Sequence, residues 1–400
     1  MSKWRTYKLG ELVTIKGGKR LPKGVLLQSA PNHHPYIRIR DLGKTRILEL
    51  DSTYEYVDDI TQKSIARYVV EKGDILLSIV GTIGLIGIVG ESLHLANQTE
   101  NCVKLINLNK VDRLYLYYYL SSKIGQIEIQ KGIVGAVQAK LPIKNIENIE
   151  ISLPPLAEQK RIADILSAID DKIELNRRIN ANLEQQAQAL YKSWFVDFEP
   201  WGGVMPKDWR EGTISDIVDL LNGFAFKSSD FVEKGLYKLI TIKGVQDGNM
   251  SLNGADCLDI IPPKMPQWCK LKKEDILLSL TGNVGRCCLV DTENCLLNQR
   301  VAKLHPKEEY NRLFVYALFR QEDMKARMIS IARGTAQMNL SPIETGKLPL
   351  IIPSNEVLKD FGNRFNNIIH TLTNNIVESS YLAQLRDTLL PKLMSGEITV

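Results

Sequence analysis

Basic and amide side chains lie beside turns in two separate parts of the chain. Lys and Arg attract phosphate oxygens, Arg can pair with guanine through two hydrogen bonds, and Asn or Gln can pair with adenine in the same way. The residues of this kind that we single out are Lys16, Lys19, Arg20, Lys23, Arg38, Arg40, Lys131, Gln138 and Lys140 in the first part, and Lys227, Lys243, Arg333, Gln337 and Asn339 in the second. A solvated surface position explains any one of them equally well. As a set that occurs twice, they favour contact with double-stranded DNA.

Two GxxG segments, at residues 81–84 and 282–285, each follow an apolar run that is typical of a buried strand. Backbone N–H groups in such a segment can hold a phosphate. The chain has neither the GxxxxGKS/T pattern nor the GxGxxG pattern of nucleotide-binding loops. We therefore prefer the interpretation that each segment is a tight turn between two buried strands.

Residues that could do catalysis lack the neighbours that catalysis needs. Glu158 and Lys160 match part of a nuclease signature, but they lie in the first turn of an expected helix, where Glu is favoured by the helix dipole. His33 and His34 lie in a loop flanked by prolines, which favours solvent exposure or DNA contact. The six cysteines form no CxxC pair and no zinc-binding pattern with His. We predict no catalytic residue, no metal site and no cofactor.

The composition is that of an ordinary globular protein with more than one domain. The chain has 400 residues, 44% of them hydrophobic, and this length exceeds what one hydrophobic core usually serves. The N-terminus lacks the apolar segment of a secretory signal, and the most apolar run, residues 75–89, is short and interrupted by glycines. Because the cysteines are best explained as reduced thiols, we expect a cytoplasmic protein.

The elements that position these residues include two long helices. Residues 154–197 begin with two prolines and then show mostly apolar residues at a spacing of 3.5, which is typical of a coiled coil. The pattern returns 199 positions later in residues 353–400, where Asn176 falls on Asn375. The expected seam consists of Ile162, Leu166, Ile169, Ile173, Asn176, Leu183 and Leu190 in the first helix, and Phe365, Ile368, Leu372, Asn375, Leu382 and Leu389 in the second. We predict that the helices pair in antiparallel orientation and that the buried Asn fixes their register.

The positive charge lies outside these helices. Residues 1–153 contain 21 Lys and Arg against 15 Asp and Glu, whereas residues 154–202 contain 6 against 8. A polyanionic partner is therefore expected to bind the globular parts of the chain.

The whole chain is an internal duplication. Residues 73–84 match residues 274–285 at an offset of 201 positions, and the same offset brings Asn97 onto Asn298. Farther along, an offset of 199 brings Gln138 onto Gln337.

This duplication divides the chain into four parts: a globular segment at 1–153, a long helix and linker at 154–202, a second globular segment at 203–352, and a C-terminal long helix at 353–400. We expect an α/β (α+β) fold in each globular segment and a pseudo-twofold relation between the repeats.

Several phrases of the sequence resemble the specificity subunit of type I restriction-modification systems. They are LPPLAEQKRIA at residues 153–163, WFVDF at 194–198, LLPKLMSGEI at 389–398, and the GDILLS and GTIG phrases within 73–84. The resemblance covers essentially the whole chain. The second repeat departs from it at Glu274, where the first repeat has Gly, and at the start of its helix, which lacks the full PPLAEQ phrase.

The resemblance implies a non-catalytic subunit with two target-recognition domains, each reading half of a split, asymmetric DNA sequence. The paired helices would fix the length of the spacer and bind two methyltransferase subunits, and restriction subunits would join for cleavage. S-adenosylmethionine, ATP and magnesium would belong to those partners. The sequence does not identify the bases. Two alternatives stay open: a self-contained methyltransferase or nuclease, and a coiled-coil adaptor that binds no DNA.

Overall fold

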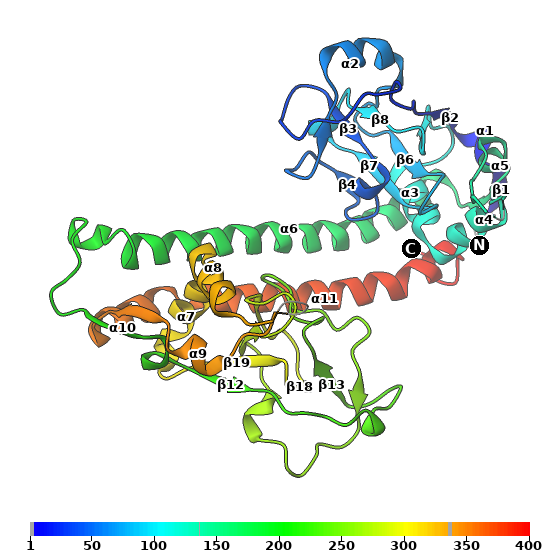
Figure 1. Ribbon diagram of the computed structural model, residues 1–400. Coiled ribbons are helices and arrows are strands. Elements are labelled where there is room, and N and C mark those ends of the chain that lie inside the picture. Colours follow the sequence, from blue (N-terminus) through cyan, green and yellow to red (C-terminus); the bar gives the residue numbers. More distant parts are fainter. Residues whose placement is uncertain (1–3, 136, 335–337) are drawn as a thin grey trace. The chain divides into compact units, whose positions relative to one another are not determined.

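The computed structural model describes residues 4–135, 137–334 and 338–400. The chain divides into two compact units: unit 1, residues 1–172 with 382–400, and unit 2, residues 173–381. Each unit combines a mixed α/β globular part with portions of the long helices (Figure 1).

Unit 1 is built around a five-stranded sheet with the order β2-β9-β6-β7-β4. Its strands are β2 (Thr14–Gly17), β9 (Cys102–Ile106), β6 (Ile75–Ser78), β7 (Ile86–Val89) and β4 (Ile47–Leu48). A three-stranded sheet contains β5 (Glu55–Tyr56), β3 (Pro35–Ile37) and β8 (Asn97–Gln98), and β1 (Arg5–Lys8) pairs with β10 (Glu150–Leu153). Every residue of β6 and β7 is buried, which explains their continuous apolar sequence.

Short helices pack against these strands. They are α1 (Leu9–Leu12), α2 (Asp59–Ile65), α3 (Arg113–Ser121), α4 (Lys123–Lys131) and α5 (Ile143–Glu147). Asp112 and Ser122 begin α3 and α4, because their side chains accept hydrogen bonds from backbone N–H groups of the first turn. The hydrophobic core joins α3 to the sheet and also includes Ile162 and Leu166 of the first long helix.

Unit 2 repeats this arrangement with a four-stranded sheet, β12-β19-β16-β17, and a second one, β14-β13-β18-β15. The strands are β11 (Arg210–Thr213), β12 (Val218–Asn222), β13 (Tyr237–Ile240), β14 (Cys257–Leu258), β15 (Lys270–Leu271), β16 (Ile276–Ser279), β17 (Cys287–Leu289), β18 (Cys295–Leu297), β19 (Val301–Pro306) and β20 (Pro349–Ile352). The helices of its globular part are α7 (Arg312–Phe319), α8 (Glu322–Ile331) and α9 (Pro342–Gly346). As β1 does with β10, β11 pairs with β20.

Strand register corrects one detail of the predicted alignment between the repeats. In the parallel pairs, Ile37 lies opposite Gln98 in unit 1, and Ile240 lies opposite Leu297 in unit 2. The structural counterpart of Gln98 is thus Leu297 and not Gln299, so the offset has already changed from 201 to 199 before β8. The predicted match of Asn97 with Asn298 is wrong, because a two-residue gap in a loop can be placed on either side of a short strand without altering the apolar pattern.

The long helices are α6 (Leu156–Phe195), α10 (Asn355–Phe365) and α11 (Asn367–Met394). Within unit 2, Asn180 Nδ2 donates to the carbonyl oxygen of Leu372 at 3.0 Å, while farther along α6 the ring of Trp194 lies 5.3 Å from that of Phe361. Later residues of α6 therefore meet earlier residues of the C-terminal helices. This confirms the predicted antiparallel pair.

All the residues expected in the helix seam are buried or partly buried. Asn176 is 1% exposed, and its Nδ2 donates to Glu378 Oε2 at 2.7 Å. Asn375 Nδ2 donates to Asn180 Oδ1 at 2.8 Å. The two asparagines thus lie in one polar layer between α6 and α11.

The C-terminal helical segment is interrupted at Asn366, between α10 and α11. Asn366 Oδ1 accepts a hydrogen bond from the backbone N–H of Leu313 at 3.1 Å, at the start of α7. Nearby, a Cβ on Gly362 would lie 2.1 Å from the carbonyl oxygen of Tyr310, so only glycine permits this approach. The interruption therefore fits α10 closely against the globular part of unit 2.

A tyrosine anchors each globular part to its portion of α6. In unit 1, Tyr118 donates to Asp170 Oδ2 at 2.6 Å, and Arg386 of α11 donates to Asp170 Oδ1 at 2.9 Å. In unit 2, Tyr316 donates to Glu184 Oε2 at 2.8 Å, and Arg320 donates to Glu184 Oε1 at 2.7 Å. Charge-assisted hydrogen bonds of this kind are stronger than neutral ones, so they hold helix and sheet in a defined orientation.

Candidate nucleic-acid interface

In unit 1 the turn after β2 lies against the segment between β8 and β9. The backbone N–H of Gly18 donates to the carbonyl oxygen of Cys102 at 3.2 Å, and that of Lys19 donates to Gln98 at 3.3 Å. A Cβ on Gly18 would lie only 2.0 Å from the carbonyl oxygen of Thr99. The glycine is required here, and it brings the predicted Lys19 and its neighbour Arg20 beside residues 99–101.

Two further segments extend this surface. The backbone N–H of Ile79, at the end of β6, donates to the carbonyl oxygen of Asn101 at 2.8 Å, and that of Leu141 donates to Ile79 at 2.9 Å. Val134 and Lys140 exchange backbone hydrogen bonds of 2.9 and 3.0 Å. We call the resulting surface, formed by residues 18–20, 79–84, 99–101, 134–135 and 137–140, the loop edge of unit 1.

Unit 2 has the same construction. The backbone N–H of Gly223 donates to Val301 at 3.1 Å, that of Leu280 donates to Arg300 at 3.0 Å, and that of Leu340 donates to Leu280 at 2.7 Å. The loop edge of unit 2 is formed by residues 223–224, 280–285, 298–300, 333–334 and 338–339. Two predicted residues, Arg333 and Asn339, exchange backbone hydrogen bonds there, as Val134 and Lys140 do in unit 1.

The GxxG segments belong to these edges as turns. Gly81 and Gly84 have φ angles of 74° and 93°, and the Ser78 hydroxyl donates to the carbonyl oxygen of Thr82 at 2.7 Å. The backbone N–H of Gly84 already donates to Ser78, and that of Gly282 to Met338. These N–H groups are occupied within the protein, which favours the turn interpretation over a phosphate cradle.

A cavity of about 400 Å³ lies beside the loop edge of unit 1. It is lined by Arg20, Leu21, Leu27, Tyr36, Arg38, Ile39, Arg40, Thr99, Glu100 and Asn101. Three of the predicted arginines thus share one site with all three residues of the segment 99–101. Such a mixture of cationic and hydrogen-bonding groups suits phosphate and base edges together.

Carboxylates control the charges of this cavity. Arg20 Nε donates to Glu100 Oε1 at 2.7 Å, and Arg38 forms an ion pair with Glu55. Partial burial acts against the charge of Glu100, but hydrogen bonds from Arg20, its own backbone and Thr99 outweigh it and lower the pKa of this carboxyl group. Burial raises the pKa of Asp41, next to Arg40, to about 6. Glu100 therefore keeps its charge to a lower pH than an ordinary Glu, whereas Asp41 titrates near pH 6.

The other predicted residues lie on the surface around the edges. Lys16, Lys23, Gln138, Lys227 and Lys243 are exposed. Exposed Lys131 pairs with Glu128 at 2.6 Å, one turn back in α4. Gln337 lies outside the described residues. The strand register makes Lys243 the counterpart of Arg40, since both lie three residues beyond Ile240 and Ile37.

Sequence reasoning missed the segments at the centre of the two edges. Glu100 and Asn101 in unit 1, and Gln299 and Arg300 in unit 2, were not among the residues singled out. An offset of 199 positions aligns Glu100 with Gln299 and Asn101 with Arg300, but the expected match of Asn97 with Asn298 implied an offset of 201.

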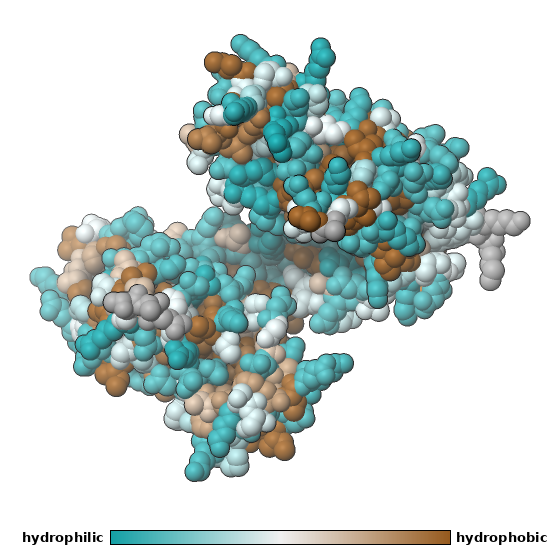
Figure 2. Space-filling view, turned by 45° about the vertical axis from the view of Figure 1, so that its right-hand side comes forward, coloured by the Kyte–Doolittle hydropathy of each residue, from teal (hydrophilic) through white to brown (hydrophobic). Residues whose placement is uncertain are grey.

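On the face seen in Figure 2, hydrophilic residues cover most of each globular part and hydrophobic ones form separate patches.

Other residues considered for chemistry have structural roles. Gln159, next to Glu158, accepts a hydrogen bond from the backbone N–H of Asp112 at 2.9 Å and donates one to the carbonyl oxygen of Pro154 at 2.9 Å. It therefore ties the start of α6 to the loop before α3.

All six cysteines are buried and free. Among the described residues, no group of three or more His, Cys, Asp or Glu side chains could hold a metal ion. Within the same residues, no helix combines the length and apolarity needed to cross a membrane.

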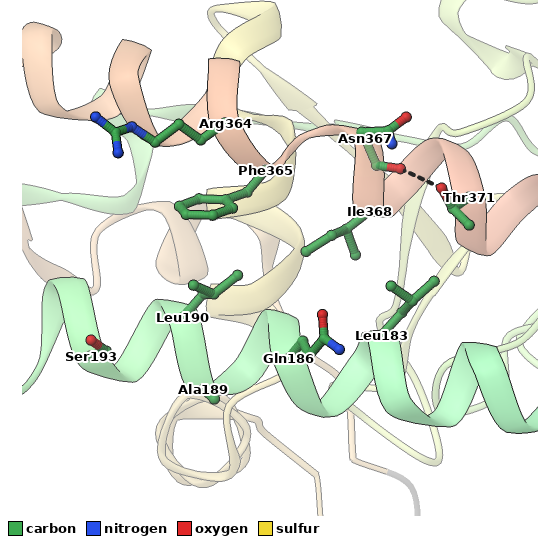
Figure 3. Close-up of a pocket in the computed structure, with 10 residues that line it drawn as sticks. All are labelled: Leu183, Gln186, Ala189, Leu190, Ser193, Arg364, Phe365, Asn367, Ile368 and Thr371. Atoms are coloured by element: carbon green, nitrogen blue, oxygen red, sulfur yellow. Dashed lines mark hydrogen bonds between the residues drawn. The ribbon is translucent and has the colours of Figure 1, made fainter.

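The helices of unit 2 form a separate apolar groove of about 540 Å³ (Figure 3). Leu183 and Leu190 of α6 face Phe365 and Ile368 across it, where α10 gives way to α11. Most of its lining surface is apolar. The groove is therefore suited to an apolar side chain of a protein partner.

The duplicated α/β units, their polar loop edges and their antiparallel helices define the class to which the chain belongs. The model of the type I restriction modification DNA specificity domain matches residues 1–185 and 206–378. The chain is a member of this family, as the phrases in its sequence indicated.

Several named proteins are similar over nearly their full length. The specificity subunit of the type I restriction enzyme HindI from Haemophilus influenzae is 24% identical over 479 aligned positions, which cover 100% of both chains. The MjaVIII specificity subunit from Methanocaldococcus jannaschii is 27% identical over 424 positions, covering 99% of this chain and 93% of the relative. The crystal structure of a type I system S subunit from M. genitalium is 19% identical, covers 98% of this chain and 96% of that one, and has a TM-score of 0.63. This last likeness supports the fold.

Proposed function

We propose that the protein is the non-catalytic, sequence-specific DNA-binding subunit of a type I restriction-modification complex, and that it recognises a bipartite, asymmetric site. One observation carries the proposal: the same loop edge is built twice, with different side chains. The two edges have the same backbone hydrogen bonds but present different polar side chains, so each unit can read a different half-sequence.

The charge of the edges supports this role. Arg20, Lys19 and Lys140 lie on one edge and Arg300 and Arg333 on the other, all of them exposed. Such residues bind phosphates and make affinity fall with salt. The carboxylates among them, such as Glu100, reduce non-specific attraction and favour readout of bases.

The partners are proposed from the family and from the helices. We propose that two methyltransferase subunits bind the paired helices, with the groove around Leu183 and Phe365 as one contact, and that restriction subunits join the complex. S-adenosylmethionine, ATP and magnesium act in those subunits. Methyl transfer by the purified chain alone would contradict the non-catalytic role.

The paired helices are proposed to act as a ruler. Residues 156–172 of α6 belong to unit 1 and residues 173–195 to unit 2, so a continuous helix connects the two readers. An α-helix is far stiffer than a loop. Its length is therefore suited to fixing the number of unspecified base pairs between the half-sites.

The test is adenine methylation of a randomised duplex library by this chain, co-expressed with its methyltransferase and analysed base by base. A shared motif with two defined halves and a fixed gap is expected. Methylation without a shared motif, or no methylation, would contradict the proposal and favour a coiled-coil adaptor that does not read DNA. An electrophoretic shift of a duplex that carries the motif, and not of a scrambled one, provides the direct binding control.

A further inference from the structure

We infer that residues 99–101 and 298–300 are the segments that select bases in the two half-sites. The inference rests on the proposed function, because it concerns which side chains of the loop edges read DNA. The polar groups are Glu100 and Asn101 in the first segment, and Gln299 and Arg300 in the second.

The two segments are held by the same backbone contacts. The N–H of Thr99 donates to the carbonyl oxygen of Ile37, and that of Asn298 donates to Ile240, in both cases at 3.1 Å. The turns after β2 and β12 lie close to one carbonyl oxygen of each segment. A Cβ on Gly18 would lie 2.0 Å from the carbonyl oxygen of Thr99, and a Cβ on Gly223 would lie 2.1 Å from that of Asn298. The main chain of each segment is thus fixed before any DNA binds.

Several residues that build this frame are the same in both repeats, whereas the three inside it are not. The matching frame residues are Gly18 and Gly223, Ser78 and Ser279, Leu141 and Leu340. Inside the frame, Thr-Glu-Asn in unit 1 is replaced by Asn-Gln-Arg in unit 2. A constant frame with three changed side chains is what two readers of different sequences need.

The side chains are available for contact. Gln299 and Arg300 are exposed, and Glu100 and Asn101 are partly exposed. Glu100 is paired with Arg20, whose side chain is 83% exposed. A pair so open to solvent is weak, so Arg20 can turn to a phosphate and leave the carboxylate for a base.

The chemistry of these groups predicts which bases they prefer. A carboxylate repels phosphates but can accept a hydrogen bond from the N4 amino group of cytosine. When Arg20 turns away, the hydrogen bonds from Thr99 and from the backbone of Glu100 still act to lower the pKa of this carboxyl group and favour its charged form. Asn101 and Gln299 suit adenine, and Arg300 suits guanine. We expect a cytosine or adenine contact in one half-site and an adenine or guanine contact in the other.

The experiment exchanges the two chemistries within the intact chain. Glu100→Gln with Asn101→Arg gives the first segment the polar groups of the second, and Gln299→Glu with Arg300→Asn does the reverse. Each double variant is co-expressed with the methyltransferase, and the methylated motif is determined on the randomised library. We expect one or more positions of the corresponding half-site to change preference by about tenfold or more, while the other half and the gap stay the same.

If a double variant methylates normally and its motif is unchanged, the inference is overturned and the proposed function stands. If the unmodified chain itself gives no motif, the proposed function fails. If a double variant gives no methylation, the isosteric single change Glu100→Gln decides: relaxed discrimination at one base pair supports the inference, and an unaltered motif refutes it. The control Glu71→Gln with Asn109→Arg makes the same charge change at exposed positions of unit 1 and should leave the motif unaltered.

Discussion

At the scale of single residues, the polar layer between the long helices is the clearest case of a buried group with a defined partner. Asn176 donates to Glu378 at 2.7 Å, and its counterpart in the repeat, Asn375, donates to Asn180 at 2.8 Å. A buried amide of this kind lowers stability but discriminates strongly between helix registers, since only one register brings polar partners together.

We predict that Asn176→Leu alters helix register or self-association and leaves the recognised bases unchanged. Leucine fills the seam, so the free energy of unfolding should change by no more than about 1 kcal/mol, while the hydrogen bond from Asn176 to Glu378 is lost. Light scattering and the methylation motif test this. A changed half-sequence with an intact gap would contradict it. Leu175→Asn, one residue away at a position that is 50% exposed, is the control.

A second residue-scale prediction concerns pH. Burial raises the pKa of Asp41 from 3.8 to about 6, so the folded state binds the proton more tightly than the unfolded state. The stabilisation from protonation is complete below pH 3.8 and is lost as the pH rises towards 6. Asp41→Asn does not titrate, and it should become more stable relative to the unmodified protein between pH 4 and pH 6.

Urea denaturation at pH 4.5 and at pH 7 measures this difference. The asparagine oxygen can still accept the hydrogen bond from the backbone N–H of Arg38, which is 2.7 Å long, so the local turn is retained. An equal stability difference between the two proteins at both pH values would show that Asp41 does not titrate as described. Asp291 in unit 2, whose pKa burial also raises to about 6, should respond independently.

At the scale of elements, the loop edge depends on close approach between β2 and the segment after β8. We predict that Gly18→Ala lowers the free energy of unfolding by more than about 2 kcal/mol and abolishes methylation, because its Cβ would lie 2.0 Å from a backbone oxygen. Gly17→Ala is the matched control, since a Cβ there meets nothing within 4 Å. Thermal melting and methylation assays compare the two variants. If Gly18→Ala and Gly17→Ala behave alike, the close approach at Gly18 is not what the loop edge depends on.

The attachment of each globular part to α6 is a second property of elements. Tyr118→Phe removes the hydrogen bond to Asp170, of 2.6 Å, and should lower the free energy of unfolding by about 1–2 kcal/mol. Tyr381→Phe, at a position that is 65% exposed, should change it very little. Denaturation curves compare the two variants. A loss of stability in both would mean that the effect does not come from the anchor.

At the scale of the whole molecule, duplication is the organising property. Two edges with the same backbone contacts and different side chains suit the asymmetric target proposed above, whereas two identical edges would favour a palindrome. On that proposal, the divergence between Thr99 and Asn298, and between their neighbours, has its function in the complete chain and not in either unit.

We predict that inserting seven residues into α6 and seven at the matching level of α11 changes the gap between the half-sites and leaves both halves the same. Two helical turns add about 10 Å, and base pairs are about 3.4 Å apart, so the gap should change by roughly three base pairs. An unchanged gap would refute the ruler. Seven residues inserted after Gly203, in the loop beyond α6, provide the control and should leave the gap as it was.

The sequence by itself determined the duplication, the antiparallel helices and the family. These properties are recorded in the order of residues: the 3.5-residue spacing, the paired asparagines and the glycine turns are local patterns that survive without the fold. The sequence also singled out Arg20, Arg38 and Lys140, because charge beside a turn, alternating along a strand or in a repeated loop is visible in the order of residues.

Only the tertiary structure decided which loops meet. Backbone hydrogen bonds join Gly18 to Cys102, and Ile79 to both Asn101 and Leu141. These residues come from separate parts of the sequence and share no periodicity. It also placed the gap between the repeats before β8, since a two-residue loop change leaves the hydrophobic pattern of short strands unaltered. Glu100 and Arg300 were not among the predicted residues, because the position of the gap was not visible in the sequence and a loop residue acquires its neighbours only when the strands on both sides have paired.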